Sequence, residues 1–398
     1  MKRGAIIIAP LLFSISVSAE SVDTEISGKL DVQARAYLDK GMYSRQNYQE
    51  QLSLSVQPEF YWQWNNSQDS VTFKPFYRYD QQDDERSHAD IRELLWNHVG
   101  DDWELKAGIG KVFWGVTEFQ HLVDTINQTD SVESFDGEEK LGQQMINLSL
   151  IRDWGVLDFF VLPGFRERTF AGKEGRLRSE FFVEGDLAQY ESSSKKDHVD
   201  YSIRWSQSID VFDIGVHWFN GTNRNPHMRL KDRQSQSYFV PYYEQINQFG
   251  IDIQATVDEW LWKFEALSRN SRHGSLTATQ AGFEYSFYGV ADSNADLGIL
   301  VEYGWDDSGE NTSSGIQNDL FLGTRLTFNN VESSDLLIGG GYDLDYDSYS
   351  LVIEGNHRIS NQLKLIVDAR FFNSDDEKDQ SYAIRQDDYL KLTLEYYF

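Results

Sequence analysis

The chain has 398 residues, a formal net charge of −28 and no cysteine, so disulfide bonds and cysteine-based metal sites are excluded. A mean hydropathy of −0.54 argues against a bundle of membrane-spanning helices, and the 14% aromatic content argues against disorder. The acidic excess disfavours nucleic acid as a partner, because phosphate contacts require Lys and Arg.

The first 19 residues have the layout of a secretory signal peptide. Lys2 and Arg3 precede a short apolar stretch, and Val17 and Ala19 are small residues before Glu20, as a cleavage site requires. The apolar stretch is too short for a stable membrane span, although a retained helical anchor is the alternative. We expect residues 1–19 to be removed, which changes the net charge from −28 to −30 because two basic residues are lost.

Alternation of apolar and polar residues dominates the rest of the chain. Leu52, Leu54 and Val56, for example, alternate with Ser53 and Ser55. A period of two is that of a β-strand with one apolar and one polar face. In chain order the predicted strands are 26–38, 51–64, 71–79, 90–99, 103–113, 144–151, 156–163, 198–205, 212–219, 246–257, 260–268, 278–287, 297–305, 318–328, 336–342, 349–358, 363–372 and 388–398.

These segments amount to about eighteen strands. Because the count is even, both ends of the chain lie on the same side of the membrane if the strands cross it. The segments 90–99 and 144–151 alternate least clearly, so sixteen strands is the alternative. Pro58 and Pro75 fall inside predicted strands. Because proline lacks the N–H that a β-ladder needs, we expect a bulge at each.

Two folds produce such strands, a soluble sandwich and a transmembrane barrel. Aromatic side chains at the ends of the apolar faces favour the barrel, as do charged residues on the polar faces and alternately short and long connections. We therefore predict an all-β fold, a closed antiparallel up-and-down transmembrane barrel over residues 20–398. Its longest predicted loops are 114–143, 165–197 and 220–244.

The last strand, residues 390–398, alternates throughout and ends in Phe398. With the signal peptide and the series of hairpins, it resembles Gram-negative outer-membrane β-barrels of the porin type. A narrower resemblance, over residues 110–165, is to a group of uncharacterised proteobacterial outer-membrane proteins. The resemblance implies a location in the outer membrane among lipid and lipopolysaccharide, and recognition of the C-terminal strand by the barrel-assembly machinery. A homotrimer is one candidate assembly.

The segment 116–142 is strongly acidic and carries an apolar stripe at Phe119, Leu122, Val123 and Ile126. A short helix with this stripe, folded into the lumen, would narrow the pore, whereas a solvated outer loop is the alternative. The candidate constriction residues are Glu118, Asp124, Asp130, Glu138 and Glu139, and the candidate basic residues of the pore wall are Arg78, Arg204, Arg325 and Arg370.

The segment 165–197 is rich in arginine, whose planar fork suits carboxylates and phosphates. Its candidate anion contacts, to a solute or to lipopolysaccharide, are Arg166, Arg168, Arg176 and Arg178. Acidic residues are frequent in the same segment, so ion pairs that order the loop are the favoured alternative. The acidic turn at Asp343, Asp345 and Asp347 lacks the spacing of an EF-hand, and we expect no metal site.

The sequence predicts a channel for passive diffusion of small hydrophilic solutes, because barrels of 16–18 strands leave an aqueous lumen. A plugged barrel that binds glycan or lipid at the cell surface is the alternative. No hydrolase or nucleotide-binding motif is present, so we expect neither catalysis nor a cofactor.

Overall fold

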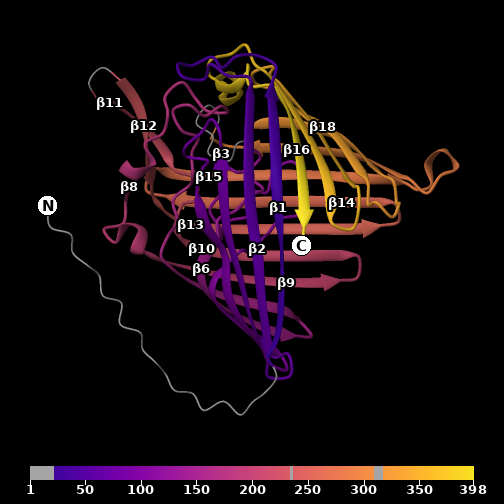
Figure 1. The fold of residues 1–398 in the computed structure, drawn as a ribbon. Helices are drawn as coiled ribbons and strands as arrows, with labels where there is room; N and C mark the ends of the chain where they lie inside the picture. The colour runs from indigo at the N-terminus through magenta and orange to yellow at the C-terminus, as the bar shows by residue number, and fades with distance from the viewer. Residues whose placement is uncertain (1–21, 234–235, 309–316) are drawn as a thin grey trace.

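The computed structural model describes residues 22–233, 236–308 and 317–398, and within them the chain forms one large antiparallel β-barrel (Figure 1). Eighteen strands form a single sheet, in which the first strand pairs with both the second and the last strand, so the sheet closes on itself. The predicted signal peptide, residues 1–19, lies outside the described residues. Among the described residues, no helix is long and apolar enough to cross a membrane.

The barrel strands are β1 (Asp23–Tyr37), β2 (Glu50–Trp64), β3 (Asp69–Asp80), β4 (Ala89–Val99), β5 (Trp103–Gly110), β6 (Gln143–Arg152), β7 (Gly155–Pro163), β9 (Val199–Ile209), β10 (Phe212–Thr222), β13 (Gln245–Val257), β14 (Trp260–Ser271), β15 (Gly274–Phe287), β16 (Asp296–Asp306), β17 (Asn318–Thr327), β18 (Asp335–Asp343), β19 (Tyr349–Arg358), β20 (Leu363–Asn373) and β21 (Tyr389–Tyr397). A second, three-stranded sheet contains β8 (Gln189–Tyr190), β11 (His227–Arg233) and β12 (Gln236–Tyr243). Short 3-10 helices are η1 (Gly185–Leu187), η2 (Lys195–Asp197), η3 (Val290–Asp292) and η5 (Gln380–Ile384).

The prediction of eighteen barrel strands is confirmed, including the two segments with the weakest alternation, which form β4 and β6. The bulge expected at Pro75 is present as a register shift between Lys74 and Pro75 in the β3–β4 ladder. The bulge expected at Pro58 is not. The β2–β3 pairing keeps one register on both sides of Pro58. It is interrupted at residues 57–59, because Pro58 lies opposite Pro75 and neither residue has an N–H to donate.

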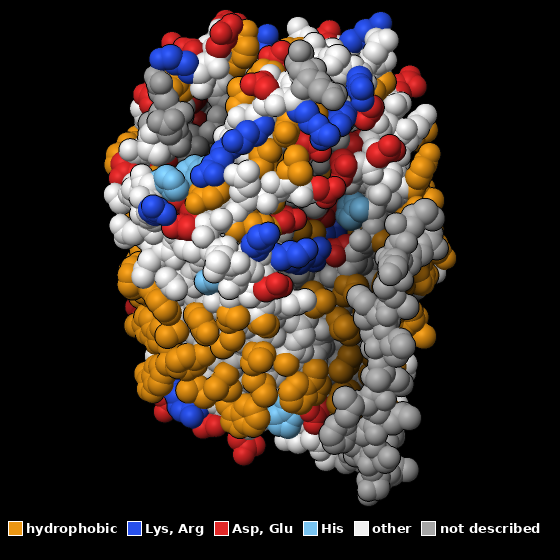
Figure 2. All heavy atoms as spheres, turned by 90° about the vertical axis from the view of Figure 1, so that its left-hand side faces the viewer, with side chains coloured by type: hydrophobic (Ala, Val, Ile, Leu, Met, Phe, Trp, Pro, Cys, Tyr) orange, Lys and Arg blue, Asp and Glu red, His pale blue; other side chains and the backbone are white. Residues whose placement is uncertain are grey.

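Side chains alternate between the lumen and the outer surface along each strand. In β21, Leu392 and Leu394 are 43% and 38% exposed, whereas Thr393 and Glu395 between them are each 6% exposed. Figure 2 shows the result on one face of the molecule, a broad hydrophobic belt across the barrel wall with charged side chains gathered beyond it. An apolar outer belt over a polar interior is the arrangement of a barrel that faces lipid.

Connections at the two ends of the barrel differ in length. One end, here called the turn end, has tight connections such as 65–68, 153–154 and 258–259. The other, the loop end, carries the connections 111–142, 164–198 and 223–244. The last of these contains the β11–β12 hairpin, which extends away from the barrel in Figure 1 and was predicted only as loop.

Candidate functional site

The connection 111–142, here called the inner loop, enters the barrel and packs against its inner wall. Val123 and Ile126 are fully buried. They belong to an apolar cluster with Trp114, Met145, Phe160, Leu162, Phe219 and Ile246, most of which come from β6, β7, β10 and β13. A second cluster holds Leu122, against which Phe119 packs, with Leu267, Leu276, Ala278 and Phe321. The apolar stripe therefore fastens the inner loop to the wall.

The helix expected in this segment is absent: residues 111–142, all of which the structure describes, form no helix and contain only isolated turns, such as the one in which the Ser134 N–H donates to the Asp130 carbonyl. Carboxylates of the wall supply the reason. Glu265 Oε1 of β14 accepts hydrogen bonds from the backbone N–H groups of Val116 (2.6 Å) and Thr117 (2.9 Å), and Glu302 Oε1 of β16 accepts from that of Glu118 (2.8 Å). The N–H of Val123, which a helix over the stripe would pair with the carbonyl of Phe119, donates to Glu265 Oε2 (3.3 Å), so the wall takes a donor that the helix needs.

Glu118 reaches across to basic side chains of the wall. Its carboxylate accepts hydrogen bonds from Arg325 of β17 and, at 3.4 Å, from Lys263 of β14. The side chain of Glu118 is 26% exposed and that of Arg325 33%, so this pair is in contact with the solvent of the lumen. A carboxylate and a guanidinium facing the same water-filled space can orient a passing dipolar or charged solute.

Asp130 fastens the second half of the inner loop to the wall. It is fully buried and accepts hydrogen bonds from Arg92 Nη1 of β4 (2.5 Å) and from the Thr169 hydroxyl (2.7 Å). Burial alone raises the pKa of Asp130, but hydrogen bonding to His88 and the positive charge of Arg92 outweigh that effect and hold its pKa well below the ordinary range. Close by, Glu133 accepts from Arg78 Nε at 2.8 Å.

The other acidic residues of the inner loop differ in exposure. Asp124 is buried beside Lys140, with 3.1 Å between carboxylate and ammonium. Asp136 pairs with Arg370 of β20 (2.6 Å) and is 25% exposed. Glu138 and Glu139 are 51% and 53% exposed, and their partners are His121 (2.9 Å) and Lys111 (3.5 Å).

The four basic wall candidates fall into two groups. Arg78 and Arg204 are largely buried, each in one ion pair, with Glu133 and with Asp252 (2.7 Å) respectively. Arg325 is 33% exposed, and Arg370, 13% exposed, also contacts Glu354 at 2.5 Å. The structure therefore brings Arg325 and Arg370 to the solvent-accessible acids of the inner loop, whereas Arg78 and Arg204 are held within the wall.

The four candidate arginines of the connection 164–198 differ in their partners, which are carboxylates for two of them and neutral acceptors for the other two. Arg166 pairs with Asp90 of β4 (2.8 Å) and Arg176 with Asp387 (2.5 Å). These partners lie far away in sequence, not among the acidic neighbours within the loop. Arg168 donates to Asn225 Oδ1 at 2.7 Å, and Arg178 donates to backbone carbonyls of its own loop.

A cavity of about 880 Å³ lies in the loop half of the lumen, here called the vestibule. Its walls include the inner loop, the connection 164–198 and the loop ends of several strands. Arg168, Arg178 and Arg269 line it, and each has one buried guanidinium nitrogen without a hydrogen-bond partner among the described residues.

Several residues that position the inner loop were not singled out from the sequence. Glu265, Glu302 and Arg92 hold the loop, and Asp136 joins it to Arg370. The only available signal was the charge on the polar faces of the strands, which does not reveal which charges meet.

Comparisons with known protein families and with curated proteins find no match for this sequence, so the narrower resemblance of residues 110–165 receives no support. Solved structures give matches. A BenF-like porin from Pseudomonas fluorescens has a TM-score of 0.57 and 9% identity, and the match covers 95% of this chain and 98% of that one.

The protein has the fold of an outer-membrane porin. Further matches are OmpT of Vibrio cholerae in its trimer form (TM-score 0.49, 8% identity, 95% of this chain and all of that one) and Salmonella typhi OmpF in complex with daunomycin (TM-score 0.46, 10% identity, 94% and 97%). At these identities the likeness concerns the fold alone. An apolar outer face over a polar interior is that of a barrel whose outer surface faces lipid.

Proposed function

We propose that this protein is an outer-membrane channel for the passive diffusion of small hydrophilic solutes. The observation that carries the proposal is the inner loop, which is held inside an eighteen-stranded barrel by ion pairs to β14, β17 and β20. A barrel of this size has an aqueous lumen, and a loop fixed inside it sets the width and the charge of the path.

The proposed constriction lies between the inner loop and the wall that faces it. Glu118 with Arg325, and Asp136 with Arg370, contribute opposite charges there, and Glu138 and Glu139 add the most exposed carboxylates of the loop. Asp124 and Asp130 are buried and act as anchors. On the vestibule side, Arg168 and Arg178 line the cavity and contribute positive charge to the path of an arriving solute.

Single-channel recording of the purified protein in planar lipid bilayers tests the proposal. We expect discrete, stable conductance steps and, under a KCl gradient, a reversal potential that shows a preference for cations, because the most exposed charges of the loop are carboxylates. A protein that folds, as judged by heat-modifiable migration, and yet gives no conductance would refute the channel.

A specific observation favours a second candidate, a plugged barrel that binds glycan or lipid. The inner loop fills the side of the lumen bounded by β6, β7, β10 and β13 with tightly packed apolar side chains. In that case conductance is absent, and purified lipopolysaccharide or its glycan binds to the loop end. The two measurements together separate the candidates.

A further inference from the structure

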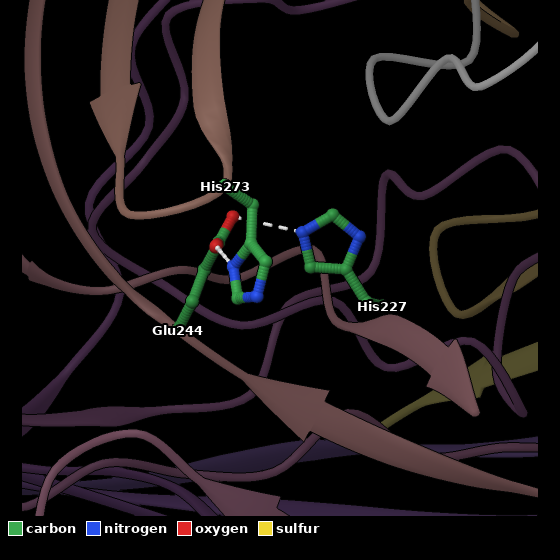
Figure 3. A group of neighbouring side chains, drawn as sticks. All are labelled: His227, Glu244 and His273. Atoms are coloured by element: carbon green, nitrogen blue, oxygen red, sulfur yellow. Dashed lines mark hydrogen bonds and ion pairs between the residues drawn. The ribbon is translucent and has the colours of Figure 1, made fainter.

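Two histidines and one glutamate converge at the loop end, outside the barrel wall. His227 begins β11, His273 lies in the turn between β14 and β15, and Glu244 lies between β12 and β13. Figure 3 shows both imidazole rings turned toward the Glu244 carboxylate. His227 Nε2 is 2.9 Å from Glu244 Oε1, and His273 Nδ1 is 2.7 Å from Glu244 Oε2.

The spacing of these atoms is close to that of a metal site. One ligand atom from each residue lies within 4.8 Å of the other two. Ligand atoms around a tetrahedral zinc ion at about 2.0–2.1 Å are about 3.3 Å apart, so side-chain adjustments of about 1 Å suffice. Two imidazoles and a carboxylate are also the ligand set of zinc sites that keep a fourth position open.

The burial of the three side chains fits the same interpretation. The Glu244 side chain is only 5% exposed, whereas those of His227 and His273 are 47% and 49% exposed. A buried carboxylate needs a positive partner. Among the described residues, neither Lys nor Arg forms a salt bridge with Glu244, and its two ion-pair partners are these two histidines. The open side of the histidines gives a cation in the medium access to the carboxylate.

We propose that His227, Glu244 and His273 bind one divalent transition-metal cation, Zn²⁺ in the first instance, with water in the remaining coordination position. Hard cations such as Ca²⁺ and Mg²⁺ prefer oxygen ligands and are excluded by the two imidazoles. The bound ion links three separate segments and thereby fastens the base of the β11–β12 hairpin to the β14–β15 turn. The proposal does not depend on the channel function.

Titration of the intact, detergent-solubilised protein with ZnCl₂ tests the site, with Ca²⁺ as a parallel probe. We expect one Zn²⁺ per chain and no Ca²⁺. Co²⁺ as a substitute is expected to give the visible absorption of a site with nitrogen and oxygen ligands. His227→Ala, His273→Ala and Glu244→Gln should each weaken Zn²⁺ binding by at least about 10–100-fold, since changes at supporting residues alone already have effects of that size.

The matched control is His98→Ala. His98 forms a single histidine–carboxylate pair, with Asp69 at 2.8 Å, near the turn end, and has no second imidazole to complete a site. Its removal should leave Zn²⁺ binding unchanged. Heat-modifiable migration confirms that each variant is folded. The proposal is wrong if the folded wild type binds no Zn²⁺, or if His227→Ala and His273→Ala bind it as tightly as His98→Ala does.

Discussion

Replacing Asp130 by Asn should weaken the attachment of the inner loop to the wall without creating a cavity. The side chain keeps its size and can still accept the hydrogen bond from Thr169, but it loses the charge that faces Arg92. Arg92 is 3% exposed and Asp130 is fully buried, so water cannot replace the lost partner. The change therefore leaves the positive charge of the buried Arg92 guanidinium without one of the carboxylates that balance it.

The size of the effect follows from burial. Neutralising one partner of a buried ion pair costs about 3–5 kcal/mol. Arg92 keeps a second carboxylate, that of Asp90 at 3.1 Å, which places the expected cost near the lower limit, at about 3 kcal/mol. Since 1.4 kcal/mol corresponds to a factor of ten, the population in which this part of the loop is detached should rise about 100-fold.

Single-channel recording detects this detachment as additional conductance transitions. Asp102→Asn is the matched control, because Asp102 is 60% exposed and pairs with Arg152 at 2.8 Å near the turn end. An exposed pair contributes at most about 1 kcal/mol, so transitions should increase no more than about fivefold. Equal transition frequencies and conductance in wild type and Asp130→Asn would show that Asp130 does not anchor the loop.

The same residue gives a prediction about pH. The pKa of folded Asp130 lies below that of the unfolded chain, so its ion pair stabilises the loop above pH ~4 and is lost as the pH falls below that value. Wild-type transitions should therefore become more frequent between pH 5 and about pH 3. In Asp130→Asn this dependence should be much weaker, and an unchanged dependence would assign it to other carboxylates.

Three further predictions concern the wall, assembly and selectivity. Leu392→Arg places a charge on the lipid-facing surface at a cost of about 2–4 kcal/mol and should impair folding much more than Thr393→Arg, as measured by urea unfolding in lipid vesicles; equal effects would contradict the facing of β21. Deletion of Phe398 should slow assembly in the outer membrane. If the folded, heat-modifiable form appears at an unchanged rate, Phe398 has no role in recognition by the assembly machinery. Neutralising Glu138 and Glu139 together, as Gln, should reduce the cation preference in the reversal potential under a KCl gradient, most at low salt. A clear anion preference in the wild type would instead assign the field to the wall arginines.

The strands of the barrel could be predicted closely because their signal is local. Each strand has one face toward lipid and one toward the lumen, so apolar and polar residues alternate along its sequence. In β21 the alternation of Leu392, Thr393 and Leu394 in sequence is the alternation of exposed and buried side chains in the structure. Even β4 and β6 form, because the closed sheet supplies partners on both sides.

The inner loop could be predicted only in part, because its conformation depends on distant residues. The apolar stripe that suggested a helix packs against the wall instead, while Glu265 accepts from the Val123 N–H that a helix would use. Partners separated by more than 140 residues leave no mark in a local pattern. For the same reason Arg176 was assigned to its own loop, although its partner is Asp387.

The residues of the proposed metal site show the limit most clearly. His227, Glu244 and His273 come from three segments and follow no short motif, so the sequence predicted no metal site. They meet because β10 pairs with β13 and β13 with β14, which brings the hairpin base beside the β14–β15 turn. Only the pairing of these neighbouring strands creates this proximity.

Net charge alone is a poor guide to the electric field of the lumen. The mature chain is expected to carry −30, yet the acids of the inner loop that are most deeply buried, Asp124 and Asp130, are paired with basic residues and add little field. In the proposed channel, the field would then depend on the few charges that remain exposed, above all Glu138 and Glu139, against the arginines of the vestibule. An acidic constriction next to a basic vestibule would favour solutes that carry both signs of charge, and replacing Glu138 and Glu139 should therefore be enough to shift the selectivity of the proposed channel.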